Sequence, residues 1–217
     1  MQTLDLSGTS KKTDGRLKSL FWPTVENAWD MDSLGQQGFW ICLIIGLISL
    51  IVVAIQASEI PNHAQGVVTL VVGVIAFFVY FAGGIGVRQA SWPAALLVFV
   101  VYVFNYLASG GLPGVIPLIV AAILLANVRA TILASQWKPA AEDEDRPMRF
   151  NETWRDKLVD QLPPRAWPIL KYPFYFFATM ILLMLLAAFG ARLLHRGVSQ
   201  APVDNPATTV TADPSDE

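Results

Sequence analysis

The chain has 217 residues, of which 54% are apolar and only 15% charged, and its formal net charge is −2. Ordinary soluble domains carry about 25% charged residues. The apolar excess lies in long separate stretches without a polar face, whereas buried helices of soluble proteins are normally amphipathic. This pattern excludes an ordinary soluble domain, and we expect the lipid bilayer, not a nucleic acid, as the main partner.

Five stretches are predicted to cross the membrane as helices of an all-α polytopic bundle. A helix rises about 1.5 Å per residue and the hydrocarbon layer is about 30 Å thick, so a crossing requires roughly 20 residues. The third stretch is the shortest and could instead form half of a re-entrant hairpin with the fourth. The predicted transmembrane helices are 39–57, 67–87, 92–109, 113–133 and 172–191.

The remaining segments divide the chain around these helices. Residues 1–38 are mostly polar, with a short apolar and basic stretch at Arg16–Phe21 that could lie on the membrane surface. Residues 39–133 form the predicted four-helix core, 134–171 a linker, and 172–196 the fifth helix with its flank. The tail, 197–217, is rich in Pro, Thr, Ala and acidic residues, a composition typical of disorder.

Basic residues predict the orientation, because they remain on the cytoplasmic side. Thirteen of the 15 fall in the amino-terminal segment, the second connection or the fourth connection with the adjoining helix end. The amino terminus is therefore expected in the cytoplasm, and five crossings place the tail outside. Arg192 and Arg196, directly after the last helix, would favour a cytoplasmic tail if one stretch fails to span.

The linker is predicted to contain a cytoplasmic amphipathic helix at about residues 151–162. Asn151 is a suitable cap, and Pro163-Pro164 is expected to end the helix. Trp154, Leu158 and Leu162 recur every four residues and form one apolar stripe. Three positions for the stripe remain open: on the bilayer, on the cytoplasmic mouths of the bundle, or against a partner protein.

Small and polar residues within the helices suggest packing sites. Ala82 and Gly86, with Gly83 between them, form a small-residue face that predicts close helix contact within the chain or in a homo-oligomer. Asn105 is expected to form hydrogen bonds across the bundle, or alternatively to line a polar pathway. Asn127 and Arg129 are expected to form a cytoplasmic end that contacts lipid phosphate.

Residues that usually carry chemistry are scarce, and we expect neither catalysis nor a cofactor. The five stretches contain no Asp, Glu, Lys or His, which argues against proton-coupled transport. Glu59 and His63 lack a third metal ligand nearby, and Cys42 is the only cysteine. Ser109 resembles a protease nucleophile only weakly, because its sole possible bases are His63 and His195.

Several short motifs resemble an uncharacterised family of small bacterial four-helix integral membrane proteins. They are Phe21-Trp22-Pro23-Thr24 with Glu26 before the first helix, a lone Arg88 after the second, and Asn127-Val128-Arg129-Ala130-Thr131 closing the fourth. The resemblance covers about residues 20–136. It implies a four-helix fold and a bacterial inner membrane but no activity, and the linker, fifth helix and tail are additions to it.

Three classes of function remain. The first is a non-catalytic membrane protein that organises lipid or partner proteins, and it fits every feature. The second is a small oligomeric channel or permease, for which these apolar helices supply little polar lining. The third is a membrane-embedded enzyme, which lacks an evident base, nucleophile pair and metal site.

Overall fold

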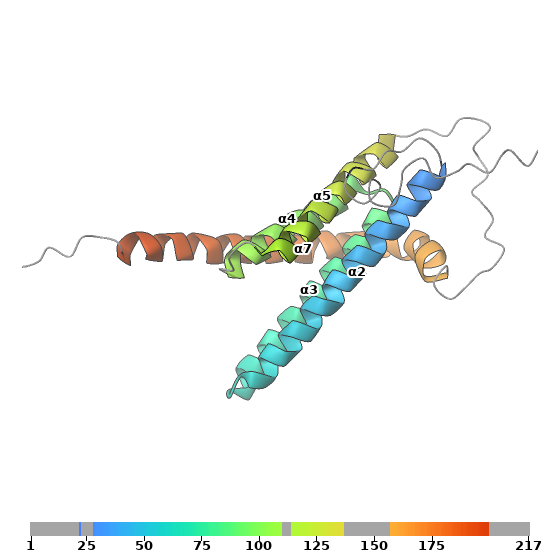
Figure 1. Cartoon of the computed structure of the whole chain (residues 1–217). Helices are drawn as coiled ribbons and strands as arrows, with labels where there is room; N and C mark the ends of the chain where they lie inside the picture. Colours follow the sequence, from blue (N-terminus) through green and yellow to red (C-terminus); the bar gives the residue numbers. More distant parts are fainter. Residues whose placement is uncertain (1–21, 23–27, 110–113, 137–156, 200–217) are drawn as a thin grey trace, which may run out of the picture.

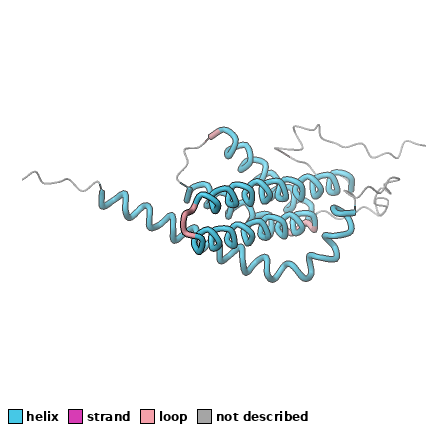
Figure 2. The backbone as a smooth tube through the Cα atoms, turned by 90° about the horizontal axis from the view of Figure 1, so that it is seen from below, coloured by secondary structure: helices cyan, strands magenta, loops and turns pink. Residues whose placement is uncertain are grey.

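A computed structural model describes residues 22, 28–109, 114–136 and 157–199. Within these ranges the chain is helical, with short connections and no strand (Figure 2). The elements are α2 (Ala28–Glu59), α3 (His63–Arg88), α4 (Trp92–Ser109), α5 (Val115–Gln136), the short π-helical turn η2 (Lys157–Gln161) and α7 (Leu162–Ser199). The amino-terminal surface segment, the turn at residues 110–113 and the tail from residue 200 lie outside the described residues.

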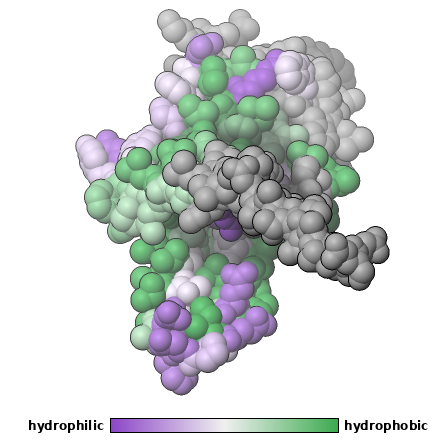
Figure 3. Space-filling view, turned by 90° about the vertical axis from the view of Figure 1, so that its left-hand side faces the viewer, coloured by the Kyte–Doolittle hydropathy of each residue, from purple (hydrophilic) through white to green (hydrophobic). Residues whose placement is uncertain are grey.

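The helices have the lengths and surfaces of a multi-pass membrane protein. Four of them, α2, α3, α5 and α7, are long and apolar enough to cross a membrane, and α4 is a shorter apolar helix. Large aliphatic side chains such as Ile48, Val68 and Ile116 lie on the protein surface. In Figure 3 mostly hydrophobic residues separate hydrophilic groups at the lower end, where α2 turns into α3, from others at the top. This surface suits an apolar solvent between two aqueous layers.

The predicted helices are present, but most are longer than predicted. The bounds of α4 agree with the prediction of 92–109, and α3 and α5 differ from theirs by a few residues at each end. The helix α2 begins at Ala28, well before residue 39. Hydropathy detects only residues inside the apolar layer, so the prediction began this helix at residue 39 and left residues 28–38 in the polar amino-terminal segment.

The carboxyl-terminal prediction needs a correction. Pro163-Pro164 does not end a helix at residue 162; α7 instead begins at Leu162 and continues to Ser199. The first backbone N–H groups of a helix have no intrahelical acceptor, so the first turn tolerates proline. Consequently the predicted amphipathic helix is, in its described part, η2 and the start of α7. The fifth helix begins ten residues earlier than predicted, and residues 197–199 belong to it and not to the tail.

Two antiparallel helix pairs and one crossing helix make up the arrangement in Figure 1. One pair is α2 with α3 and the other is α4 with α5. The long helix α7 runs obliquely across both pairs and packs on α3 and α4. Its red carboxyl-terminal part extends beyond them in Figure 1. Where α7 still packs on the bundle, Leu182 and Leu185 contact the core while Leu183 and Met184 are exposed.

Glycines allow α2 and α3 to approach closely along their length. Cβ atoms added at Gly66 or Gly84 would lie 2.9 Å from the Ala57 carbonyl oxygen and 3.0 Å from Cys42 Cβ, respectively. At Gly73 an added Cβ would overlap Val53. The absent side chains therefore bring the two backbones close enough for extensive van der Waals contact.

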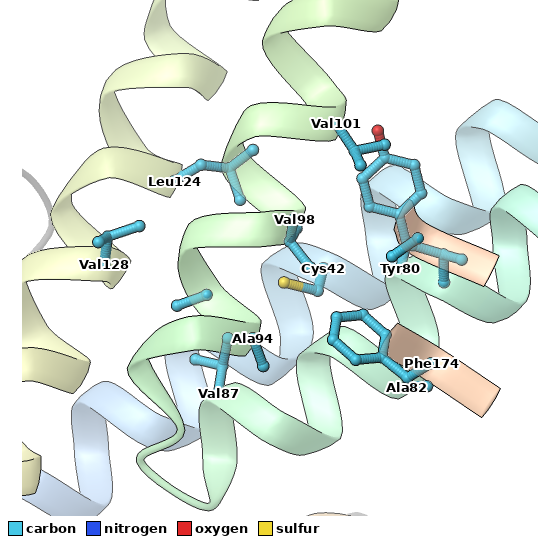
Figure 4. Packing of buried hydrophobic residues seen from close by; sticks show 13 residues of the cluster. Cys42, Tyr80, Ala82, Val87, Ala94, Val98, Val101, Leu124, Val128 and Phe174 are labelled. Carbon is cyan, nitrogen blue, oxygen red and sulfur yellow. The ribbon is translucent and has the colours of Figure 1, made fainter. Parts of the chain in front are cut away.

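Glycines on the other side of α3 receive α4 and α7. A Cβ on Gly83 would overlap Val98 of α4, and one on Gly86 would lie 2.7 Å from both Ala94 Cβ and Trp167 Cη2. Figure 4 shows the adjoining core, where Ala82, Val98 and Phe174 come together from three helices. The small-residue face predicted from Ala82 to Gly86 thus packs within the chain.

Replacing these glycines tests the packing. Gly86→Ala and Gly83→Ala should each lower the free energy of unfolding by about 1–3 kcal/mol, because a well-packed core must shift to accept a methyl group. The measurement is unfolding of the detergent-solubilised protein by denaturant titration. Gly190→Ala is the control, since nothing lies within 4 Å of its added Cβ. Equal stability of all three variants would contradict the close contact around α3.

Candidate functional site

A buried arginine connects three elements at one end of the bundle. Arg88, the last residue of α3, is 11% exposed in its side chain. Its Nη2 donates to Oδ1 of Asp32 on α2 and to Oδ1 of Asp160 on η2, both at 2.5 Å. Nη1 donates to the Asp32 carbonyl oxygen at 3.1 Å, and Nε donates to the Val159 carbonyl oxygen at 3.2 Å. We call Arg88, Asp32 and Asp160 the Arg88 cluster.

The early start of α2 makes this cluster possible. Asp32 lies in the polar part of the helix, one turn before Gly35. A Cβ on Gly35 would lie 3.0 Å from Arg88 Nη1, so the missing side chain leaves space for the guanidinium. A charge removed from water must be both paired and hydrogen-bonded. The extended α2 supplies a carboxylate and a carbonyl oxygen for this purpose.

An apolar anchor holds η2 in place. Val159 is fully buried with Phe39 of α2 and Ile85 of α3, and Leu158 and Leu162 pack against the same cluster. The sequence left three positions open for the amphipathic stripe. Its described residues, Leu158 and Leu162, pack at the mouth of the bundle. Trp154 lies outside the described residues, and its position stays a prediction.

The turn from α3 to α4 places the next helix beside the cluster. Ser91 N donates to Gly86 O and Ala90 N to Val87 O, the pattern of a Schellman motif. Ala90 occupies the left-handed position with φ 54°, where glycine is usual. Backbone strain of this kind persists only where the surrounding structure enforces it. The turn therefore fixes the direction in which α4 runs from the end of α3 at Arg88.

Asn127 of α5 is buried, and its predicted contact with lipid phosphate stays a prediction. It is 4% exposed and faces α2, where a Cβ on Gly38 would lie 3.5 Å from its Cγ. Its Nδ2 is buried without a hydrogen-bond acceptor in the described structure. Asn127 lines a cavity of about 20 Å³ between α2, the α3–α4 turn and α5, together with Gly35, Arg88 and Thr131.

Arg129 and Asn105 occupy separate positions. The Arg129 guanidinium lies 3.8 Å from the centre of the Trp22 ring, a cation–π contact. Two residues apart on a helix, Asn127 and Arg129 point in different directions, so they do not form the shared end that the sequence suggested. Asn105 is exposed on α4, far along the helix from the Arg88 cluster.

In the described part of the chain, the polar side chains at this end form ion pairs and hydrogen bonds, and the apolar ones pack together. Among the described residues no group of three or more His, Cys, Asp or Glu is placed to hold a metal ion. Cys42 is buried in the apolar core, and Glu59 and His63 lie at the turn between α2 and α3. The only strongly polar assembly identified in these ranges is the Arg88 cluster with its adjoining cavity.

Comparisons of the chain with protein-family models, with curated proteins and with solved structures find no match.

Part of the cluster is visible in the sequence. Arg88 is a lone basic residue between two apolar stretches, and Asp32 and Asp160 stand in the polar segments beside the predicted helices. Their sequence separations from Arg88 are 56 and 72 residues. Spacing along the chain does not identify partners at such distances, although the isolation of Arg88 indicates that it needs one.

Removing the charge of Arg88 should destabilise the protein strongly. Arg88→Met leaves two carboxylates without their guanidinium, and breaking a buried pair in this way costs about 3–5 kcal/mol. Asp160→Asn should have a smaller effect, because the Asp160 side chain is 36% exposed. The measurement is denaturant unfolding in detergent, with a double-mutant cycle between positions 88 and 160. A coupling energy near zero would show that Asp160 does not stabilise Arg88.

Proposed function

We propose that this chain is a non-catalytic, multi-pass protein of a bacterial inner membrane that organises lipid or partner proteins at its cytoplasmic face. The observation that carries the proposal is that the Arg88 guanidinium is hydrogen-bonded almost entirely within the protein. Four of its five N–H groups bind within the protein, to α2 and η2. A charged group engaged in this way stabilises the architecture and is unavailable to a substrate.

The arrangement of the helix ends supports a cytoplasmic position for the cluster. Five elements meet around Arg88 and the cavity: the start of α2, the end of α3, the start of α4, the end of α5, and η2. These are the ends that border the basic segments of the sequence. The positive-inside tendency therefore favours this end as cytoplasmic, while the bacterial inner membrane rests on the family resemblance.

Helix lengths support five crossings. The 18 residues of α4 span about 27 Å at 1.5 Å per residue, close to the hydrocarbon thickness. The 38 residues of α7 span about 57 Å, so this helix crosses at a tilt or extends beyond the membrane. An odd number of crossings places the end of α7 on the outer side.

Topology mapping tests the orientation. A reporter protein fused after Arg196 should give a periplasmic signal, and one fused within the linker, after Ala141, should give a cytoplasmic signal. The paired fusions share the first four helices, and the longer one adds the rest of the linker, η2 and α7 up to Arg196. A cytoplasmic signal from both would exclude five crossings.

Affinity purification tests the organising role. A partner held by the linker should be lost from Trp154→Glu, because a charge at the start of the stripe disrupts an apolar contact. Leu158→Glu is unsuitable for this purpose, since Leu158 packs on the bundle and its replacement would perturb the fold. Arg129→Gln, at a separate position, is the matched control. An identical set of co-purified proteins from Trp154→Glu and the wild type would argue against the linker as an interaction site.

An oligomeric channel or permease is the second candidate, and one observation favours it. Asn105 is a polar residue exposed on the surface of the apolar helix α4, so it would line a pathway enclosed between the α4 helices of several copies. Solute flux into reconstituted vesicles that disappears with Asn105→Leu would support this function. Flux that is absent from wild-type vesicles would oppose it.

A further inference from the structure

We infer that the bilayer is thinned on one side of the bundle, beside the ends of α4, α5 and α7 that lie away from Arg88, and that this side favours phospholipids with short acyl chains. The inference deepens the proposed function and rests on it, because it assumes a membrane-spanning chain that organises lipid. Its basis is that the two helix pairs reach different depths. In Figure 1 the α2–α3 pair extends at its lower end well beyond the α4–α5 pair.

Close contacts between α3 and α4 show how these antiparallel helices are aligned. A Cβ on Gly86 would lie 2.7 Å from Ala94 Cβ, and one on Gly83 would overlap Val98. Each residue farther along α4 therefore lies level with one residue earlier in α3.

On this alignment α4 ends well before α3 does. Asn105 lies level with about Ile75, and Ser109, the last residue of α4, lies level with about Val71. The helix α3 extends beyond that point to His63, a further eight residues or about 12 Å at 1.5 Å per residue.

The helix α5 also stops short of the turn between α2 and α3. Its first residue is Val115, and Gly114 N donates to Tyr106 Oη of α4 at 3.1 Å. Tyr106 directly follows Asn105. Both helices of the α4–α5 pair therefore stop near the level of Asn105.

The α2–α3 pair keeps an apolar surface beyond the end of α4. Gly66 approaches the Ala57 carbonyl here, so the two helices remain paired. Exposed glutamines appear only near the turn, at positions 56 and 65. A continuous apolar surface of this kind requires lipid around it. The large aliphatic side chains exposed in this part are Ile55, Val67, Val68, Leu70 and Val71.

Polar side chains of α4 and α7 lie at a different depth. Asn105 is exposed on α4, and the rings of Phe104 and Phe189 meet with 6.4 Å between their centroids. Arg192, three residues after Phe189 on α7, is also exposed. Amide and guanidinium groups are costly to hold in hydrocarbon, although an arginine reaches some way toward the headgroups. These residues therefore favour an aqueous boundary near the end of α4.

A flat bilayer does not suit both sides of the bundle. A boundary at the glutamines of the α2–α3 pair would leave Asn105 about 13 Å inside the hydrocarbon, whereas a boundary at Asn105 would expose the aliphatic surface of α3 to water. A bilayer adapts to a short apolar surface by thinning. Short acyl chains lower the cost of this adaptation, so they are favoured beside α4.

Cysteine labelling in vesicles of dioleoylphosphatidylcholine tests the inference at two positions of equal depth. Leu107→Cys on α4 and Val74→Cys on α3 replace side chains that are 45% and 50% exposed. With a membrane-impermeant maleimide on both faces of the membrane, Leu107→Cys of the full-length protein should react at least tenfold faster than Val74→Cys. The wild type, in which Cys42 is buried, gives the background.

Lipid selection is the second measurement. Bilayer discs are excised with styrene–maleic acid copolymer from vesicles of dimyristoleoyl and dierucoyl phosphatidylcholine, and their lipids are compared with those of the bulk membrane. Discs of the wild type should be at least twofold enriched in the shorter lipid. The Asn105→Leu/Arg192→Leu variant should lose this enrichment, because its apolar surface is longer beside α4. Gln56→Leu/Gln65→Leu is the matched control and should retain it.

Several results would overturn the inference. Fast labelling at both positions would show that the α2–α3 pair projects into water, where a partner protein or a second copy must cover it. Slow labelling at both would place the end of α4 in hydrocarbon. Fast labelling of Leu107→Cys alone, without enrichment of the shorter lipid, would assign the water beside α4 to a pore. Any of these results with the expected topology intact would remove the thinning and leave the multi-pass arrangement standing.

Discussion

The structure depends on how one guanidinium is accommodated at the end of an apolar helix. Arg88 follows a long uncharged stretch, and the removal of its charge from water requires carboxylates close by. Asp32 meets this requirement only because α2 continues about three turns beyond its apolar part, and Asp160 only because η2 is packed against Phe39 and Ile85. The same interaction therefore fixes the start of α2, the end of α3 and the approach to α7.

Packing around α3 depends on the absence of side chains as much as on their presence. Gly84 faces α2, while Gly83 and Gly86 face α4 and α7, so one short segment admits helices on several sides. Lipid tails are as apolar as leucine, so close van der Waals contact replaces the hydrophobic effect as the force between helices. The contact of α3 with α4 and α7 at Gly83 and Gly86 is near the Arg88 end. Farther along, Ile48 of α2 and Val68 of α3 are exposed, as expected for residues that meet lipid.

Sequence reasoning located the apolar spans well, because bilayer thickness imposes a minimum length that hydropathy measures directly. It failed where that constraint does not act. The polar start of α2 lies outside the apolar layer. A proline pair such as Pro163-Pro164 fits the first turn of one helix as well as the position after the end of another, so the sequence alone does not distinguish the two. Asn127 and Arg129 are close in sequence, but two residues on a helix correspond to about 200° of rotation, so their side chains point in different directions. The partners of Arg88 depend on tertiary contacts that no local pattern encodes.

The buried amide of Asn127 is the point at which stability alone does not account for the residue. Its Cγ lies close to the Cβ position of Gly38, in a space where a leucine would match the surrounding apolar residues with no polar atom to satisfy. Arg88, by contrast, is almost fully satisfied by the protein itself. Both residues line the same small cavity, but the Nδ2 atom of Asn127 is itself buried against α2 near Gly38. One end of the bundle thus combines a buried donor without an acceptor in the described structure and a strained turn at Ala90, two local costs that the surrounding packing must offset.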